Sequence, residues 1–187
     1  MRRRGAVRRL RGALLAGLLL LPGCGGTTLD VEANRSGHWN GRVDRLLVLL
    51  GREMGPGQDA DAFAAALRRH LAGCGLVAEV LVPPPDADLA LDGDPTERRS
   101  RERERALRPD ALLAMHWASV ASRSGSVAVT YDLRLLRVPD RKPVWRALAT
   151  LRPSGDPGEG TSEFARLLVA HLARDGVIRP CPASSAH

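Results

Sequence analysis

The sequence predicts a mixed α/β (α+β) fold: a single mixed sheet of about five strands with helices packed on it, in the order β-α-β-α-β-β-β-α. Three observations carry this prediction. The apolar run 46–50 is short and unbroken, which is typical of a central strand buried on both faces. Residues 126–138 alternate between apolar and polar, and a turn leads into 144–151, which predicts a hairpin. Apolar residues recur at helical spacing in 63–71 and 164–172.

The amino-terminal half alternates strands with helices. After the first strand, a helix begins at Asp59, carries its apolar stripe on one face and ends at Gly73. Residues 76–82 are expected to form a second strand, which Pro83 ends. A capping sequence at 94–97 then begins a helix that is almost wholly charged.

The carboxyl-terminal half contributes a third strand over 110–120, the hairpin, and a last helix that begins at Thr161 or Ser162. Right-handed crossovers place the first two helices on opposite faces if the strand order begins 2-1-3. The last helix then covers the apolar side of the hairpin. The polar side stays open, and it is the preferred candidate for a partner surface, formed by Thr130, Asp132 and Arg134.

The first 23 residues have the signs of an export signal. Six arginines and no acid precede an apolar run, 13–21, which spans only about 14 Å as a helix and is too short to cross a bilayer core. The next residues, Leu21-Pro22-Gly23-Cys24, resemble the lipobox of bacterial lipoproteins, although a small or aliphatic residue is usual at Pro22. The resemblance implies cleavage after Gly23 and lipidation of Cys24. A plain signal peptide or an uncleaved anchor, with Cys24 incidental, is the alternative.

The same resemblance implies a location. Gly25 follows the cysteine, where an Asp would retain an enteric lipoprotein in the inner membrane, so we expect an outer-membrane protein that faces the periplasm. Its diacylglycerol and palmitate chains would be the membrane contact. Residues 24–42 are expected to be the lipidated cysteine and a flexible tether, in which Trp39 either docks on the domain or lies at the headgroups. The domain follows over 43–178, and a tail over 179–187.

The net charge of the chain belongs to the export signal. The 187 residues contain 28 Lys and Arg against 21 Asp and Glu, a formal charge of +7. Residues 1–23 hold six arginines and no acid, so the mature chain has 22 cations and 21 anions, or +1. With the excess gone and few aromatic residues to stack on bases, we expect no nucleic-acid partner.

The mature domain resembles small uncharacterised periplasmic lipoproteins whose fold is similar to the TolB amino-terminal and CsgG-like accessory domains. The matching stretches are Arg45-Leu46-Leu47-Val48-Leu49, Asp110-Ala111-Leu112-Leu113, and the hairpin from Tyr131 to Lys142-Pro143-Val144-Trp145-Arg146. Arg141 stands where glycine is usual in that hairpin. The resemblance covers about 43–178 and implies an envelope adaptor or assembly accessory that is not an enzyme.

The charged helix supports two interpretations. Arginine holds phosphate through a bidentate fork, so its five arginines are a candidate site for an anionic envelope glycolipid or polymer. They are Arg98, Arg99, Arg101, Arg103 and Arg105. Glutamates lie among them, however, and opposite charges at i and i+4 favour a solvated helix with surface ion pairs.

Cysteines and histidines offer little further chemistry. Cys74 and Cys181 either pair in an oxidising compartment or stay as free thiols, and the predicted topology brings them to the same edge. His70 and His171 hold matching positions on the apolar stripes of two helices. A zinc ion bound there would lack further ligands. The simpler interpretation is that each histidine lies at the edge of the core with its tip hydrogen-bonded. The acidic loop 86–94 lacks the spacing of a calcium loop. We expect no metal and no cofactor.

Recognised catalytic motifs are absent from the sequence, including the nucleophile elbow, the phosphate loop and the zinc-protease helix. We therefore expect a lipoprotein that is not an enzyme and binds an envelope protein through its open sheet face. The first alternative is binding of an anionic glycolipid or polymer through the arginine helix. The second is a hydrolase, for which Ser122, Ser124 and Ser126 lack a positioned base.

Overall fold

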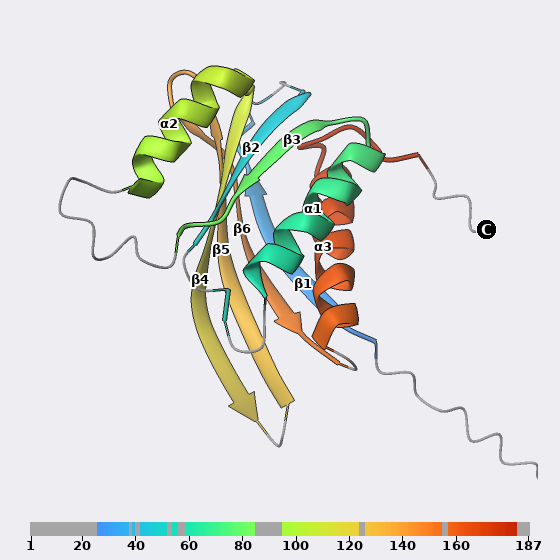
Figure 1. Cartoon of the computed structure of the whole chain (residues 1–187). Helices are drawn as coiled ribbons and strands as arrows, with labels where there is room; N and C mark the ends of the chain where they lie inside the picture. Colours follow the sequence, from blue (N-terminus) through green and yellow to red (C-terminus); the bar gives the residue numbers. More distant parts are fainter. Residues whose placement is uncertain are drawn as a thin grey trace, which may run out of the picture.

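The computed structural model describes residues 26–37, 39, 42–51, 54–55, 59–84, 95–123, 126–154 and 157–182. In this part of the chain six strands form one mixed sheet, in the order β1-β6-β5-β4-β2-β3, together with three helices (Figure 1). The predicted fold class is therefore confirmed, with one strand more than expected. None of the described helices is long and apolar enough to cross a membrane.

The sheet joins a parallel half to an antiparallel half. Its strands are β1 (Thr28–Arg35), β2 (Arg45–Leu50), β3 (Val77–Leu81), β4 (Ala111–Arg123), β5 (Ser126–Arg137) and β6 (Pro143–Arg152). The central strand β2 pairs in parallel with β3 and β4, and it is buried on both faces, as its unbroken apolar run predicts. All other pairings are antiparallel. The expected 2-1-3 strand order is correct.

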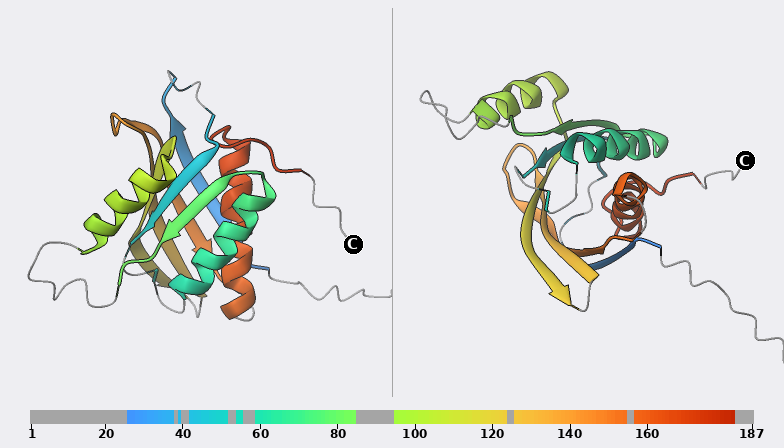
Figure 2. Two further views of the ribbon diagram at one scale, coloured as in Figure 1. Left: turned by 45° about the horizontal axis from the view of Figure 1, so that its top comes forward. Right: turned by 60° about the horizontal axis from the view of Figure 1, so that its bottom comes forward.

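The helices lie on opposite sides of the sheet. They are α1 (Ala60–Gly73), α2 (Pro95–Leu107) and α3 (Pro157–Arg174). Helices α1 and α3 pack together on the side toward which the strands curve, while α2 lies across the other face (Figure 1, Figure 2). Asp59 caps α1 by accepting hydrogen bonds from two backbone N–H groups of the first turn.

The core lies between the sheet and the α1–α3 pair. Its centre is aromatic: the rings of Phe63 and Phe164 are 4.8 Å apart, and those of Tyr131 and Phe164 are 5.1 Å apart. The Tyr131 hydroxyl donates to the backbone carbonyl of Met54, so its one polar group is satisfied. Burial raises the pKa of Tyr131 far above its usual range.

The expected tether is in large part a strand. Residues 28–35 form β1, which pairs with β6 along its whole length, so this part of the prediction for 24–42 is wrong. The strand forms because Leu29 and Val31 alternate with acidic residues and pack on the core, while α3 contacts it from the helix side. Thr27 is also held, because its hydroxyl exchanges hydrogen bonds of 3.2 and 3.3 Å with the backbone of Ser154. Trp39 is buried against the domain.

Two further boundaries differ from the prediction. Helix α3 begins at Pro157 instead of Thr161, since proline suits the first helical position. Strand β4 runs on to Arg123, with a bulge between Trp117 and Ser119. Arg141, where the resembling hairpin has glycine, adopts a left-handed backbone with φ of 54°, which explains the usual preference. Residues 1–23, Cys24 and the acidic loop 86–94 lie outside the described residues.

Candidate functional site: the open face of the sheet

One face of the antiparallel half of the sheet has none of the described helices over it. Helix α2 contacts β2 on this side, where Leu47 and Leu112 are buried, and it does not extend over β5, β6 and β1. Alternation along the strands directs every second side chain toward this open face. From β5 these are the predicted Thr130, Asp132 and Arg134, and the register adds Arg146, Leu148 and Thr150 from β6.

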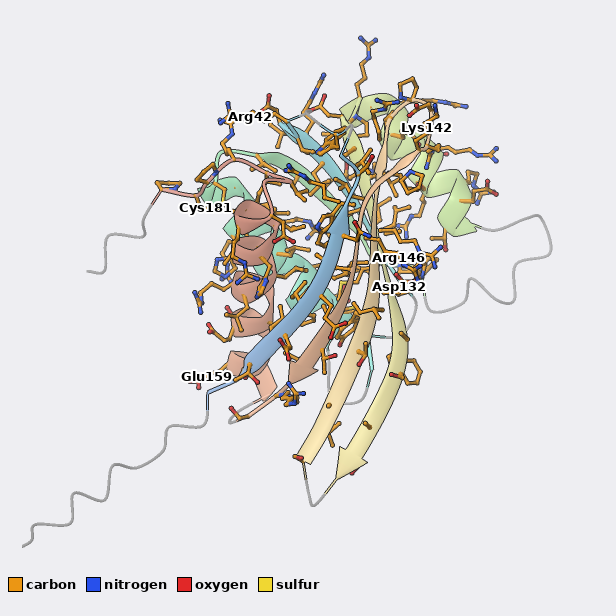
Figure 3. The ribbon with its side chains drawn as sticks, turned by 180° about the vertical axis from the view of Figure 1, so that it is seen from behind. Arg42, Asp132, Lys142, Arg146, Glu159 and Cys181 are labelled. Carbon is orange, nitrogen blue, oxygen red and sulfur yellow. A yellow bond between two sulfur atoms is a disulfide. The ribbon has the colours of Figure 1, made fainter. Side chains whose placement is uncertain are left out.

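Asp132 is the centre of an ionic cluster on the open face. It accepts hydrogen bonds from Nε and Nη2 of Arg134 at 3.1 and 2.7 Å, and from the same two atoms of Arg146 at 3.1 Å each. Figure 3 shows Asp132 beside Arg146 on the neighbouring strand. The Asp132 side chain is only 14% exposed, whereas those of Arg134 and Arg146 are 51% and 60% exposed. One carboxylate therefore holds two arginines whose outer edges stay in water.

The cluster fixes the charge of its carboxylate. Partial burial alone would raise the pKa of Asp132, but the hydrogen bonds from Arg134 and Arg146 outweigh it and hold that pKa below its usual range. Asp132 is thus an anion at neutral pH, and the three side chains together carry one net positive charge.

The surroundings of the cluster combine polar and apolar groups. The hydroxyl groups of Thr130 and Thr150 are 3.2 Å apart across the β5–β6 pair. Leu148, the β6 partner of Asp132, is 43% exposed. Strand β1 brings Glu32 opposite Leu148 at the edge of the sheet. A face with ordered charges around an exposed leucine can hold a protein surface by complementary charge and apolar contact.

Sequence analysis missed the β6 and β1 members of this face. The alternation of Arg146, Leu148 and Thr150 with buried residues is present in the sequence, but only the register shows which of them adjoin Asp132. No group of three or more metal-ligating side chains occurs among the described residues.

The five arginines of α2 do not form one surface. Arg101 pairs with Glu97 at 2.5 Å on the same helix, and Arg103 pairs with Glu79 of β3 at 3.2 Å. Only Arg101 and Arg105 line the groove at the carboxyl end of α2. The predicted grouping of Arg98, Arg99, Arg101, Arg103 and Arg105 is therefore not brought together as a single site.

A different set of arginines surrounds that groove, which we call the arginine groove. Its volume is about 610 Å³, and it lies where α2 ends, β4 begins and the β5–β6 turn passes. Its charged lining residues are Arg45, Arg101, Arg105, Arg108, Arg141, Glu104 and Asp110. Both carboxylates are engaged, since Glu104 pairs with Arg141 and Asp110 accepts the backbone N–H groups of Asp44 and Arg45. Five cations against two anions leave a positive groove.

A second groove lies between α1 and α3 beside a disulfide. Cys74 and Cys181 are bonded, with their Cα atoms 4.2 Å apart, which decides between the two states considered from the sequence. The groove holds about 790 Å³, and its described lining includes His70 and three arginines but no serine and no carboxylate. The imidazole of His70 meets the backbone of Ser162, and that of His171 meets the backbone of Leu29. Nε2 of His70 is nevertheless buried without a hydrogen-bond partner among the described residues, so the predicted hydrogen-bonded tip is only partly present there.

Comparison with known proteins finds similar structures among solved bacterial proteins. A PelC dodecamer from Paraburkholderia phytofirmans has a TM-score of 0.50 and 17% identity, covering 80% of this chain and 99% of that one. A second PelC dodecamer from that organism has a TM-score of 0.47 and 19% identity, covering 82% and 100%. Lipoprotein GNA1162 from Neisseria meningitidis gives 0.40 and 14%, covering 70% and 96%.

These identities show the fold alone. No protein-family model and no curated protein matches the sequence. The likeness to TolB and CsgG-type domains stays a prediction.

Proposed function

We propose that this chain is a lipid-anchored envelope protein that is not an enzyme and binds a protein partner on its open sheet face. The observation that carries the proposal is the Asp132 cluster: two arginines are ordered by one largely buried carboxylate on a face that none of the described helices covers. Ordering these side chains costs conformational entropy. The free protein has already lost that entropy, so the binding of a partner does not have to offset it.

The anchor in this proposal is Cys24, in the outer membrane on the periplasmic side. Its support is the lipobox-like sequence and the short apolar run before it. Cys24→Ser should abolish incorporation of labelled palmitate and release the protein from the membrane fraction. Cys181→Ala is the control, because it removes another cysteine without touching the lipobox. Palmitate labelling that persists in Cys24→Ser would contradict this anchor.

Site-specific photo-crosslinking in cells tests the partner surface. A photoreactive residue at Arg134 or Leu148 should give a discrete protein adduct, because both positions face outward on the open face. The matched control is Ala65, which is exposed on α1 on the other side of the sheet. Adducts at Ala65 but none at the two open-face positions would refute the proposed surface.

The mass of the adduct also identifies the kind of partner. The solved PelC proteins that share the fold are dodecamers, so a second copy of this chain is one partner to consider. An adduct of twice the chain mass would indicate self-assembly, and any other mass would indicate a different envelope protein.

The arginine groove favours a second candidate function, binding of an anionic polymer. Arg105 and Arg108 have no ion pair among the described residues, and Arg45 is 4.0 Å from Asp110, so these three guanidinium groups are open to an anion. Arg105→Gln/Arg108→Gln should then remove a salt-sensitive association with polyphosphate. Arg98→Gln/Arg99→Gln, which changes the same charge outside the groove, is the control. Equal binding by both variants would refute the groove as the site.

A further inference from the structure

We infer that the outer end of the β4–β5 hairpin docks on the surface of the bilayer that holds the lipid anchor. This inference rests on the proposed lipidation of Cys24. The hairpin end consists of residues 117–123 and 126–128, and it extends past the helices at one end of the sheet (Figure 1). The occupant of this surface is the lipid headgroup region, and the argument comes from the register, the reach of the chain and the composition of the hairpin.

The register places the hairpin end at the same end of the sheet as the start of β1. Leu29 pairs with Leu151, Leu151 with Val129, and Val129 with Val120, so these four residues form one row across the sheet. Beyond that row β4 continues for three residues to Arg123, about 10 Å at 3.3 Å per residue. Strands β1 and β4 are three strand spacings apart, or about 14 Å.

The reach from the anchor to the domain is short. Thr27 is fixed to Ser154 by two hydrogen bonds, two residues before the Leu29 row and on the side where the hairpin extends. The Cα atoms of Cys24 and Thr27 can be at most about 11 Å apart, since a chain spans no more than about 3.6 Å per residue. Lipid chains on Cys24 therefore bring the end of the sheet that carries the hairpin to the membrane surface.

The hairpin end has the composition of an interfacial contact. From residue 111 to residue 131 the chain contains one charged residue, Arg123, and no acid, in a protein of which 26% is charged. Trp117, Val120 and Val127 are 39%, 37% and 37% exposed. Tryptophan is enriched at membrane–water interfaces, and valine and alanine add apolar area without a charge to desolvate.

At this end of the sheet, the distribution of charge favours the hairpin over strand β1 as the part that contacts the bilayer. Asp30 and Glu159 lie on the β1 side, where Figure 3 shows Glu159 close to the start of that strand. The hairpin side carries no carboxylate, so it meets anionic headgroups without repulsion. The contact surface is thus the hairpin, with β1 serving as the attachment.

Tryptophan fluorescence of the lipidated protein in vesicles tests the inference. Trp39 and Trp145 are buried, so Trp117 is the tryptophan that lipids can reach. In phosphatidylethanolamine–phosphatidylglycerol vesicles with brominated acyl chains, we expect a blue shift and a loss of emission that Trp117→Phe removes. Val120→Asp/Val127→Asp should abolish the quenching. The control Val77→Asp, an exposed apolar residue at the other end of the sheet, should leave the quenching unchanged, and thermal melts check that each variant folds.

The outcomes separate this inference from the proposed anchor. Emission that is insensitive to brominated lipid while the lipidated protein is bound to vesicles would refute hairpin docking and leave the anchor intact. If mass spectrometry finds no lipid on Cys24, the mature chain can be held on nickel-chelating vesicles by an amino-terminal histidine tag. Quenching there would support the hairpin contact even though the anchor had failed, and no quenching would refute it.

Discussion

The two faces of the antiparallel half of the sheet are built from the same strands, β1, β6 and β5, yet their surroundings differ. Tyr131 and Asp132 are neighbours in β5, but Tyr131 packs on Phe164 in a closed core while Asp132 orders two arginines on a face open to water. Alternation along the strand thus places a core side chain and a side chain of the proposed partner surface next to each other in the sequence. Changes on the helix face should affect the free energy of unfolding, and changes on the open face should affect binding.

The largest expected loss of stability comes from a change in the aromatic core on the helix face. Phe164→Ala removes a fully buried ring that contacts both Phe63 and Tyr131, and it should lower the free energy of unfolding by about 3–5 kcal/mol. Leu148→Ala on the open face should change it by less than about 0.5 kcal/mol. Denaturant titration of both variants measures this difference, and equal losses would contradict the contrast between the faces.

Removing the disulfide should have the next largest effect. Cys74→Ala/Cys181→Ala opens a covalent loop with a sequence separation of 107, and it should cost about 2–4 kcal/mol. A melting temperature lower by about 2–4 °C for each kcal/mol is expected in calorimetry. Adding reductant to the native protein should reproduce the shift, and a variant as stable as the oxidised protein would disprove this contribution.

A smaller, pH-dependent loss should come from the two histidines of the helix layer. Burial lowers the pKa of His70, with help from Arg69 and Arg166, and burial also lowers that of His171, with help from Arg174. The unfolded chain therefore binds protons more readily, so stability should be complete above about pH 7.5 and fall as the pH drops below about 6.5.

The control for this pH dependence is His70→Gln/His171→Gln. Urea titrations at several pH values should show a flatter profile for this variant between about pH 7.5 and about pH 5.5. The same slope in both proteins would assign the loss to other groups. Hydrogen bonds from arginines lower the pKa of Asp132 and of Glu163, which moves their titration away from this range and not into it.

The smallest effect on stability is expected at the site itself. Asp132→Asn removes the charge that Arg134 and Arg146 share, but both guanidinium groups are exposed and can hydrate, so the cost should be at most about 1 kcal/mol. The adduct formed by a photoreactive residue at Leu148 should nevertheless be lost. An adduct retained with unchanged yield would show that Asp132 is not needed for partner binding.

Sequence alone predicts the parts of this protein whose patterns are local. The unbroken run of β2, the Asp59 cap of α1 and the alternation of β5 each specify an element without help from distant residues. Strand β1 was missed because its alternation of Leu29 and Val31 with acids is short and follows glycines that suggest a tether. The signal was present, however, as a period of two.

The candidate sites could be predicted only in part because they join distant segments. Thr130, Asp132 and Arg134 follow from one strand, whereas Arg146 enters the cluster through a strand pairing. The arginine groove takes Arg45, Arg108 and Arg141 from three different segments, and no spacing in the sequence relates them. Charge along one helix was a poor guide, because Arg103 pairs with Glu79, an acid that only the fold brings near, and because only two of the five arginines line the groove.

The pairing of β1 with β6 also has a consequence for how the chain becomes a folded domain. The first described strand closes against one of the last, with Thr28 opposite Arg152. Nearly the whole polypeptide must therefore have been synthesised before this edge of the sheet can form. Long-range pairings of this kind slow folding, since the loop must close before its contacts stabilise it. For the proposed export across a membrane, such a delay would keep the chain unfolded until translocation is almost complete.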